Sequence, residues 1–138
     1  MKKEISCAWA GGMAFEAEVY GHKVRLDADA ASGGADSGPS PKALVLAALA
    51  GCTGMDVVSI LAKMREPLTW FDMKLEGEVA EEHPKRYTAF RIVYEFKASD
   101  KLDEANVRKA VTLSQEKYCG VSATLAAAGP VEWEIRYI

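Results

Sequence analysis

One long apolar segment constrains the fold of this chain more than any other feature of its sequence. Residues 43–62 contain a single charged residue, Asp56, and many alanines and glycines. Ser40 followed by Pro41 is a typical helix start, because a serine hydroxyl accepts a free backbone N–H and proline has none to leave unpaired. The pattern therefore predicts a helix that runs to about residue 65 and has no polar face over its first half.

A helix without a polar face must be surrounded by protein. Length and composition alone would let this segment span a membrane, but charged residues return at once on both sides and no aromatic belt flanks it. A globular protein away from the membrane is therefore the prediction. In a chain of 138 residues one sheet covers only one side of such a helix. A second subunit is the simplest cover for the other side.

The rest of the chain shows β-strand alternation separated by turn signals. The alternation predicts strands over residues 5–9, 13–20, 22–28, 68–80, 87–98 and 131–138, and a second helix over residues 101–118. The order βββ-α-ββ-α-β, with mostly hairpin connections, predicts one α+β domain over residues 1–138 with a mostly antiparallel sheet. Residues 29–39, rich in Gly, Ala, Ser and Asp, are predicted to form an exposed, mobile loop.

Charge and composition narrow the classes of function. The net charge of −3 and a pI near 5.4 lack the basic footprint of a nucleic-acid-binding protein. No apolar stretch near the start resembles a signal peptide, which predicts a cytoplasmic protein. In that reducing compartment three cysteines do not predict a disulfide framework. They predict either buried small side chains or thiols with a chemical role.

Cys52 is the first candidate for such a role. It lies in the middle of the apolar helix, between Gly51 and Gly54. Each glycine inside a helix costs about 1 kcal/mol relative to alanine, so the pair indicates that something approaches closely there. A second helix, a partner chain or a substrate tail would fit. Plain packing of a small buried side chain is the alternative.

The other two cysteines differ in their surroundings. Cys119 falls at the C-terminal end of the second predicted helix, which is the wrong end of the helix dipole for lowering a thiol pKa. It therefore suits a resolving thiol better than an attacking one. Cys7 alternates with Ile5 and Trp9 on the first strand, and we predict that it fills the core.

Other chemistries find little support in the sequence. No CxxC occurs, and both histidines, His22 and His83, fall in predicted turns, so we predict no metal site. A hydrolase with a Cys–His pair is formally open, but nothing favours it. Neither GxGxxG nor a Walker pattern occurs, so no nucleotide cofactor is predicted.

Three segments taken together resemble the OsmC/Ohr family, and its OsmC-like subgroup in particular. GPSPKALVLAALAGCTGMDVV, residues 38–58, resembles the first cysteine helix of the family. LSQEKYCGV, residues 113–121, resembles its second cysteine segment, and the hairpin WAGGMAF, residues 9–15, resembles the start of the subgroup. The expected element order also matches over nearly the whole chain.

This resemblance implies a function and an assembly. It implies an intertwined homodimer, in which two six-stranded sheets wrap two central cysteine-bearing helices. It also implies a thiol-dependent reductase that prefers organic hydroperoxides. Cys52 would attack the peroxide and become a sulfenic acid, and Cys119 would condense with it to a disulfide. A dithiol reductant, of the lipoyl type for example, would then restore both thiols.

Two positions decide how far the resemblance extends. Family members place an arginine near the attacking cysteine, oriented by a glutamate at the helix start. Arg25 is the candidate for the arginine, although an outward-facing strand residue is the alternative there. Lys42 stands where the glutamate would be, which reverses a charge. Besides the peroxidase, two alternatives therefore stay open: a module that binds a small hydrophobic ligand or senses oxidants, and a protein whose cysteines only pack.

Overall fold

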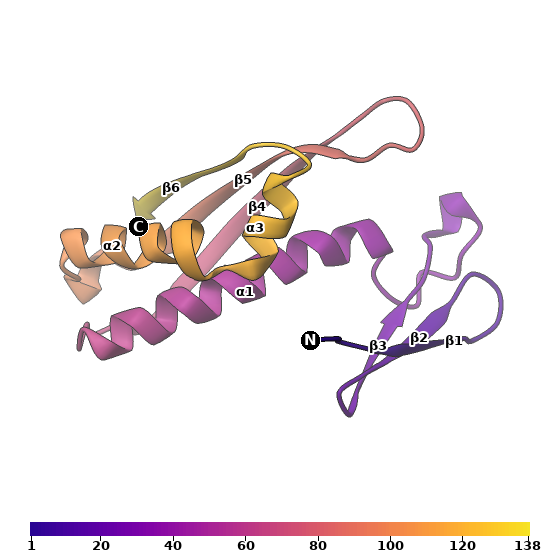
Figure 1. Cartoon of the computed structure of the whole chain (residues 1–138), viewed down its shortest axis with the longest axis horizontal. Helices are drawn as coiled ribbons and strands as arrows, with labels where there is room; N and C mark the ends of the chain where they lie inside the picture. The colour runs from indigo at the N-terminus through magenta and orange to yellow at the C-terminus, as the bar shows by residue number, and fades with distance from the viewer. The chain divides into compact units, whose positions relative to one another are not determined.

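The computed structural model describes residues 1–138, which divide into two compact units, Met1–Val45 and Leu46–Ile138. The first unit holds β1 (Ser6–Trp9), β2 (Phe15–Val19), β3 (His22–Leu26), the short 3-10 helix η1 (Ala30–Ser32) and the beginning of α1 (Pro41–Lys63). The second holds the rest of α1 and then β4 (Phe71–Val79), β5 (Tyr87–Phe96), η2 (Ala98–Asp100), α2 (Glu104–Leu113), η3 (Ser114–Tyr118), α3 (Gly120–Ala126) and β6 (Val131–Tyr137) (Figure 1).

The first unit is an antiparallel meander in the order β1-β2-β3. Gly11 and Gly12 have positive φ, which is why the turn after β1 needs glycine there. Cys7 is exposed on β1. The prediction that it fills the core is therefore wrong. The reason is that these short strands have almost no core of their own, since Ala17 is the one strand residue that is fully buried.

The segment after β3 carries more internal bonding than its composition indicated. The buried Asp27 carboxylate accepts hydrogen bonds from the Ala28 N–H at 2.7 Å and from the Ser37 N–H at 3.1 Å. Asp29 caps η1 by accepting the N–H of Ser32 at 2.8 Å. A side chain at Gly34 would collide with the Ala28 carbonyl. The predicted loop is thus tied to the end of β3 by polar contacts.

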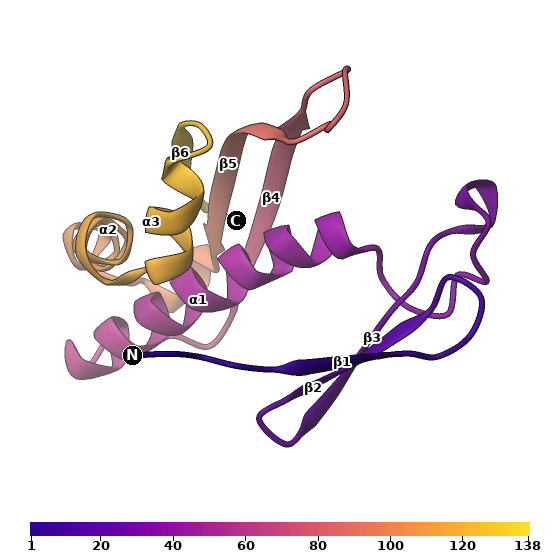
Figure 2. The same cartoon turned by 45° about the vertical axis from the view of Figure 1, so that its right-hand side comes forward.

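The second unit is a three-stranded sheet with helices on one face. β5 lies in the centre, antiparallel to β4 and parallel to β6. Its inward residues, Phe90, Ile92, Tyr94 and Phe96, are almost fully buried against apolar residues of α1 and α2. Figure 2 shows α1, α2 and α3 beside this sheet. The parallel pair needs a long crossover, which α2, η3 and α3 provide.

The α+β class and the mostly antiparallel pairing are as predicted, but the second helical region is not. Instead of one helix over residues 101–118, α2 begins at Glu104, because Asp103 caps it by accepting the N–H groups of Ala105 and Asn106. The chain then widens into a π-turn at η3 and continues as α3, which the sequence did not predict. The order is therefore βββ-α-ββ-α-α-β with a π-turn between the last two helices.

Helix α1 has two different apolar faces in the second unit. Leu49, Thr53, Val57 and Leu61, spaced four apart, are completely buried. On the opposite side Met55 is 75% exposed and Val58 is 45% exposed. By length and composition alone α1 could cross a membrane, but its buried face packs into the core of the second unit, so it is a core helix. The absence of a polar face is as predicted.

Candidate active site

The structure brings Cys52 and Cys119 together in the second unit. Cys52 lies half-buried in the middle of α1, and Cys119 is 3% exposed at the start of α3. Both belong to the apolar cluster under the sheet. The two thiols lie close enough to interact, and the proximity of Cys52 helps to raise the pKa of Cys119.

The π-turn places Cys119. The Cys119 N–H donates to the Ser114 carbonyl at 2.8 Å, five residues back. In a regular α-helix Tyr118, four positions after Ser114, would lie on the same core-facing side as Ser114. Here Tyr118 is 53% exposed. The wider turn brings Cys119 inward instead. π-turns of this kind are frequent at functional sites.

Burial raises the pKa of the Cys119 thiol to about 11. The backbone N–H of Ser122 donates to the Cys119 sulfur at 3.3 Å, which lowers this pKa, but not enough to offset the loss of hydration. The contact with Cys52 and the charge of Asp56 raise it further. Cys119 is therefore a neutral thiol near pH 7. The sequence argued against a lowered pKa by placing Cys119 at a helix C-terminus. That argument is wrong, because Cys119 is also the N-cap of α3, where the helix dipole favours a thiolate. The pKa is raised by burial instead.

A buried polar network adjoins the two thiols. Thr53 Oγ1 lies 2.6 Å from Tyr94 Oη and 2.8 Å from Ser114 Oγ. Ser114 donates to an Asp56 carboxylate oxygen at 2.9 Å. Gln115 Nε2 lies 3.1 Å from Thr53 Oγ1 and 2.8 Å from Tyr94 Oη. This network joins α1, β5 and η3, and its member Thr53 follows Cys52 directly in α1.

Arg25 lies in the first unit, on the exposed side of β3. Its Nε donates to Ser37 Oγ at 2.9 Å, and Ser37 Oγ donates to an Asp27 carboxylate oxygen at 2.5 Å. Bonds from the Ser37 hydroxyl and backbone lower the pKa of Asp27. Arg25 also lies 4.0 Å from a Glu16 carboxylate oxygen. The guanidinium is thus held by its own unit, in the outward orientation that the sequence left open.

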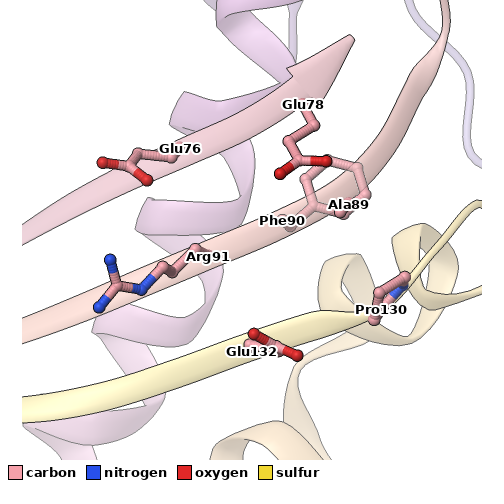
Figure 3. Close-up of a pocket in the computed structure, with 7 residues that line it drawn as sticks. All are labelled: Glu76, Glu78, Ala89, Phe90, Arg91, Pro130 and Glu132. Atoms are coloured by element: carbon pink, nitrogen blue, oxygen red, sulfur yellow. The ribbon is translucent and has the colours of Figure 1, made fainter. Parts of the chain in front are cut away.

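A separate hollow of about 230 Å³ lies on the side of the sheet away from the helices (Figure 3). Glu76, Glu78, Arg91 and Glu132 line it, with Arg91 opposite Glu76 and Glu132 in the strand register. It contains no nucleophile, and Arg91 forms its ion pair with Glu134, which does not line the hollow. No group of three or more His, Cys, Asp or Glu side chains is arranged to hold a metal ion.

Several site residues were missed at the level of sequence. Asp56 was visible as the one charge in the apolar helix, but its partner Ser114 was assigned only to a core-facing position. Thr53, Tyr94 and Gln115 gave no separate signal. The signal that could have found them is a polar residue within a predicted buried stripe of a helix or strand. A buried hydroxyl or amide requires a hydrogen-bond partner, so such a residue indicates a polar network.

A helix-borne thiol facing a second thiol, under a small mixed sheet, defines a class of small α+β proteins with a two-cysteine site. The family model described as OsmC-like protein matches residues 33–134. Protein YhfA of Escherichia coli strain K12 is 38% identical over 121 residues, which cover 87% of this chain and 87% of the relative. The chain belongs to the OsmC-like family.

Solved structures carry the same fold. A hypothetical protein from Aquifex aeolicus VF5 is similar with a TM-score of 0.82 and 28% identity, covering 100% of this chain and 98% of that chain. An organic hydroperoxide resistance protein OsmC from Legionella pneumophila is similar with a TM-score of 0.71 and 16% identity. The match covers 100% of this chain and 98% of that chain. At that identity the second likeness concerns the fold alone.

Proposed function

We propose that this protein is a thiol-dependent hydroperoxide reductase in which Cys52 attacks the peroxide and Cys119 resolves the product. The observation that carries the proposal is that two thiols far apart in sequence lie close enough to interact within one apolar cluster. Packing alone does not require two cysteines to face each other. The partly open position of Cys52 and the deep burial of Cys119 fit a first and a second step respectively.

The cycle has three balanced steps. The Cys52 thiolate attacks the outer peroxide oxygen, an S–O bond forms, the O–O bond breaks, and the leaving alkoxide takes a proton to become an alcohol. The Cys119 sulfur then attacks the sulfenic acid, forming a disulfide, and water leaves with the Cys119 proton. A dithiol reductant of the lipoyl type exchanges with the disulfide and is itself oxidised. No cofactor is needed. We place this cycle in the cytoplasm, where such dithiols are kept reduced.

The apolar surroundings of Cys52 favour organic hydroperoxides over hydrogen peroxide. Cys52 packs against the hydrophobic cluster of the second unit, and an alkyl tail gains free energy on leaving water for such surroundings. The relative from Legionella pneumophila is named an organic hydroperoxide resistance protein, which supports the same substrate class.

The decisive test follows oxidation by mass spectrometry in quenched mixtures. With an organic hydroperoxide we expect one oxygen atom to be added at Cys52, followed by a Cys52–Cys119 disulfide. Hydrogen peroxide should react more slowly. Thiols that stay free under both peroxides would overturn the proposal. They would favour a module that binds a small hydrophobic ligand, which a search for co-purified apolar compounds would then address.

We further propose that Arg25 supplies the positive charge that activates Cys52. Its guanidinium is held through Ser37 by the buried Asp27, without the glutamate that Lys42 replaces at the helix start. Arg25→Gln is therefore expected to slow Cys52 oxidation by about a hundredfold, the usual cost of losing a preorganised donor. The matched control is Lys23→Gln on the same strand, which should leave the rate unchanged. Equal rates in Arg25→Gln and the parent protein would remove Arg25 from the site.

We also propose a homodimer in which a second copy covers α1, and a single domain over residues 1–138. A groove of about 460 Å³ runs along the exposed face of α1 and is lined by Ala50, Gly51, Gly54, Met55, Val58, Ser59, Phe71 and Met73. Gly51 has open space where a side chain would be, so nothing within the chain explains this glycine. Apolar patches of this kind mark interfaces. The nearly coreless sheet of the first unit likewise needs packing from elsewhere.

Met55→Glu is expected to break this dimer, because it buries a charge without a partner at the centre of the groove. The molar mass measured by light scattering after size exclusion should fall to that of one chain, 15.0 kDa. Lys109→Glu, at an exposed position of α2 outside the groove, should keep the dimer. A parent protein that is already monomeric at micromolar concentration would contradict the proposal.

A further inference from the structure

Gln115 lies at the junction of the buried polar network with the Cys119 segment. One end of its amide contacts the hydroxyls of Thr53 and Tyr94, at 3.1 Å and 2.8 Å. The other end, Oε1, accepts a hydrogen bond from the Ser122 hydroxyl at 2.6 Å. Ser122 in turn gives its backbone N–H to the Cys119 sulfur at 3.3 Å. The chain of contacts therefore runs from the core to the resolving thiol through this one amide.

Proton counting fixes the direction of every bond in the network. An ionised Asp56 can only accept, so the single Ser114 proton goes to it. Thr53 must then donate to Ser114, and this uses the only hydroxyl proton of Thr53. In the remaining contact Tyr94 must donate to Thr53. All three hydroxyls therefore donate in one direction, toward the carboxylate, which polarises the row.

This direction leaves Gln115 a single orientation. Thr53 and Tyr94 have no free protons, so both need a donor from Gln115, and the two N–H bonds of Nε2 meet that need. Its oxygen must then face Ser122. A flipped amide would set its oxygen against two hydroxyls that cannot donate. No buried side-chain nitrogen or oxygen in the structure lacks a partner, so the arrangement is fully satisfied.

We propose that Gln115 is a positioning residue for the resolving step: through Ser122 it holds the start of α3, and thus the Cys119 sulfur, against Cys52. This role rests on the proposed two-cysteine cycle and adds a residue that touches neither the peroxide nor the reacting sulfur of Cys52. Cys119 is 3% exposed, so the position of its sulfur depends on the contacts around it, and those of Ser122 with Cys119 and Gln115 are among them.

Gln115→Met tests the role, since methionine has nearly the same size but no amide. We expect peroxide oxidation of Cys52 to be unchanged and disulfide formation to slow by about tenfold to a hundredfold, the cost of misplacing a reacting group by about 1 Å. The sulfenic acid should then accumulate and be trapped by a cyclic dione. Ser122→Ala removes only the hydrogen bond between Gln115 and α3, and it should slow the same step to a smaller degree. This second variant keeps the role testable if Gln115→Met does not fold.

Thr124→Ala is the matched control. Its hydroxyl also lies on α3, is exposed and bonds only to the Gly120 carbonyl. Both rates should stay at the parent values. If Gln115 had a merely structural role, melting temperature would fall in Gln115→Met while the ratio of the two rates stayed constant. That result, or parent-like disulfide formation in both Gln115→Met and Ser122→Ala, would overturn the proposal.

A second readout does not depend on peroxide chemistry. In a Cys7→Ser background, Cys52 is capped with a nitrothiobenzoate group as a mixed disulfide. Attack by Cys119 forms the Cys52–Cys119 bond and releases the coloured thiolate, while the Cys119 proton goes to solvent. Gln115→Met should slow this release by the same factor. If the parent protein does not react with peroxide but Gln115→Met still releases the thiolate more slowly than the parent, the proposed function is refuted and the role of Gln115 is kept. Unchanged release would refute the role of Gln115 alone.

Discussion

Replacing Cys52 by serine is expected to reduce hydroperoxide turnover to the uncatalysed background. A hydroxyl of ordinary acidity is a far weaker nucleophile toward the O–O bond than a thiolate. Of the two neighbouring thiols, the half-buried Cys52 is more accessible to peroxide than the buried Cys119. Consumption of an organic hydroperoxide, measured with excess dithiol, gives the rate. The substitution changes one atom, so the fold should be retained.

Cys7→Ser is the matched control for this experiment. Cys7 is exposed on β1 and therefore open to adventitious oxidation. Its replacement should leave turnover unchanged and should remove any background due to a surface thiol. Turnover that survives in Cys52→Ser but is lost in Cys7→Ser would transfer the attacking role to β1 and would contradict the proposed site.

The apolar helix could be predicted from sequence because local and global signals agree there. The start at Pro41, the long run of small and apolar residues and the later stop all point to one helix, and α1 runs from Pro41 to Lys63. Because the first half of the helix has no polar face, the sequence also predicted that protein must cover the helix on more than one side. The exposed stripe that includes Met55 and Val58 shows that one side stays open in the single chain.

The failures have a different physical origin. Residues 101–118 contain no proline and have a continuous helical pattern, so nothing local marks the π-turn at η3. The turn exists because Ser114 is held by Thr53 and Asp56 of α1, contacts that sequence alone does not place. Cys7 failed for the opposite reason. Its alternation was that of a strand, but alternation says only which residues share a face, not whether another layer covers it.

The candidate site divides in the same way. The two cysteines could be named from the resemblance of their segments, and the structure brings them into contact. The network around them depends on contacts of Thr53 with residues more than forty positions away in the sequence. Such long-range pairs leave no local pattern. Arg25 could be named as a candidate from its place on the third strand. Only the structure reveals that Ser37 binds its guanidinium and that Asp27 binds Ser37.

Replacing Cys119 by serine is expected to separate the two halves of the cycle. Cys52 should still take one oxygen atom from the peroxide, but no disulfide can follow. Turnover should fall on the order of a hundredfold or more, because an external dithiol replaces a thiol held at high effective concentration. Intact-mass measurement should find a stable sulfenic acid, one per chain. A serine oxygen can still accept the Ser122 N–H, so α3 should keep its start.

The pH dependence of disulfide formation in the parent protein tests the same residue from another side. Burial raises the pKa of Cys119 to about 11 in the reduced protein. Once Cys52 is a neutral sulfenic acid, its charge no longer contributes, whereas burial and the Asp56 charge remain. The pKa of Cys119 therefore stays raised. The attacking form is the thiolate, whose fraction below the pKa grows about tenfold per pH unit.

The rate of disulfide formation should accordingly rise from pH 7 upward by about tenfold per unit, and level off only as the pH passes the pKa of Cys119. Rapid quenching and mass spectrometry between pH 6 and 10 would measure it, with sulfenic acid and disulfide followed together after the addition of one equivalent of peroxide. In Cys119→Ser no disulfide should form at any pH. A parent rate that is flat from pH 7 upward would mean that Cys119 attacks without first losing its proton to solvent. The proton would then pass directly to the departing oxygen, and the buried thiol would act as acid and nucleophile in one step.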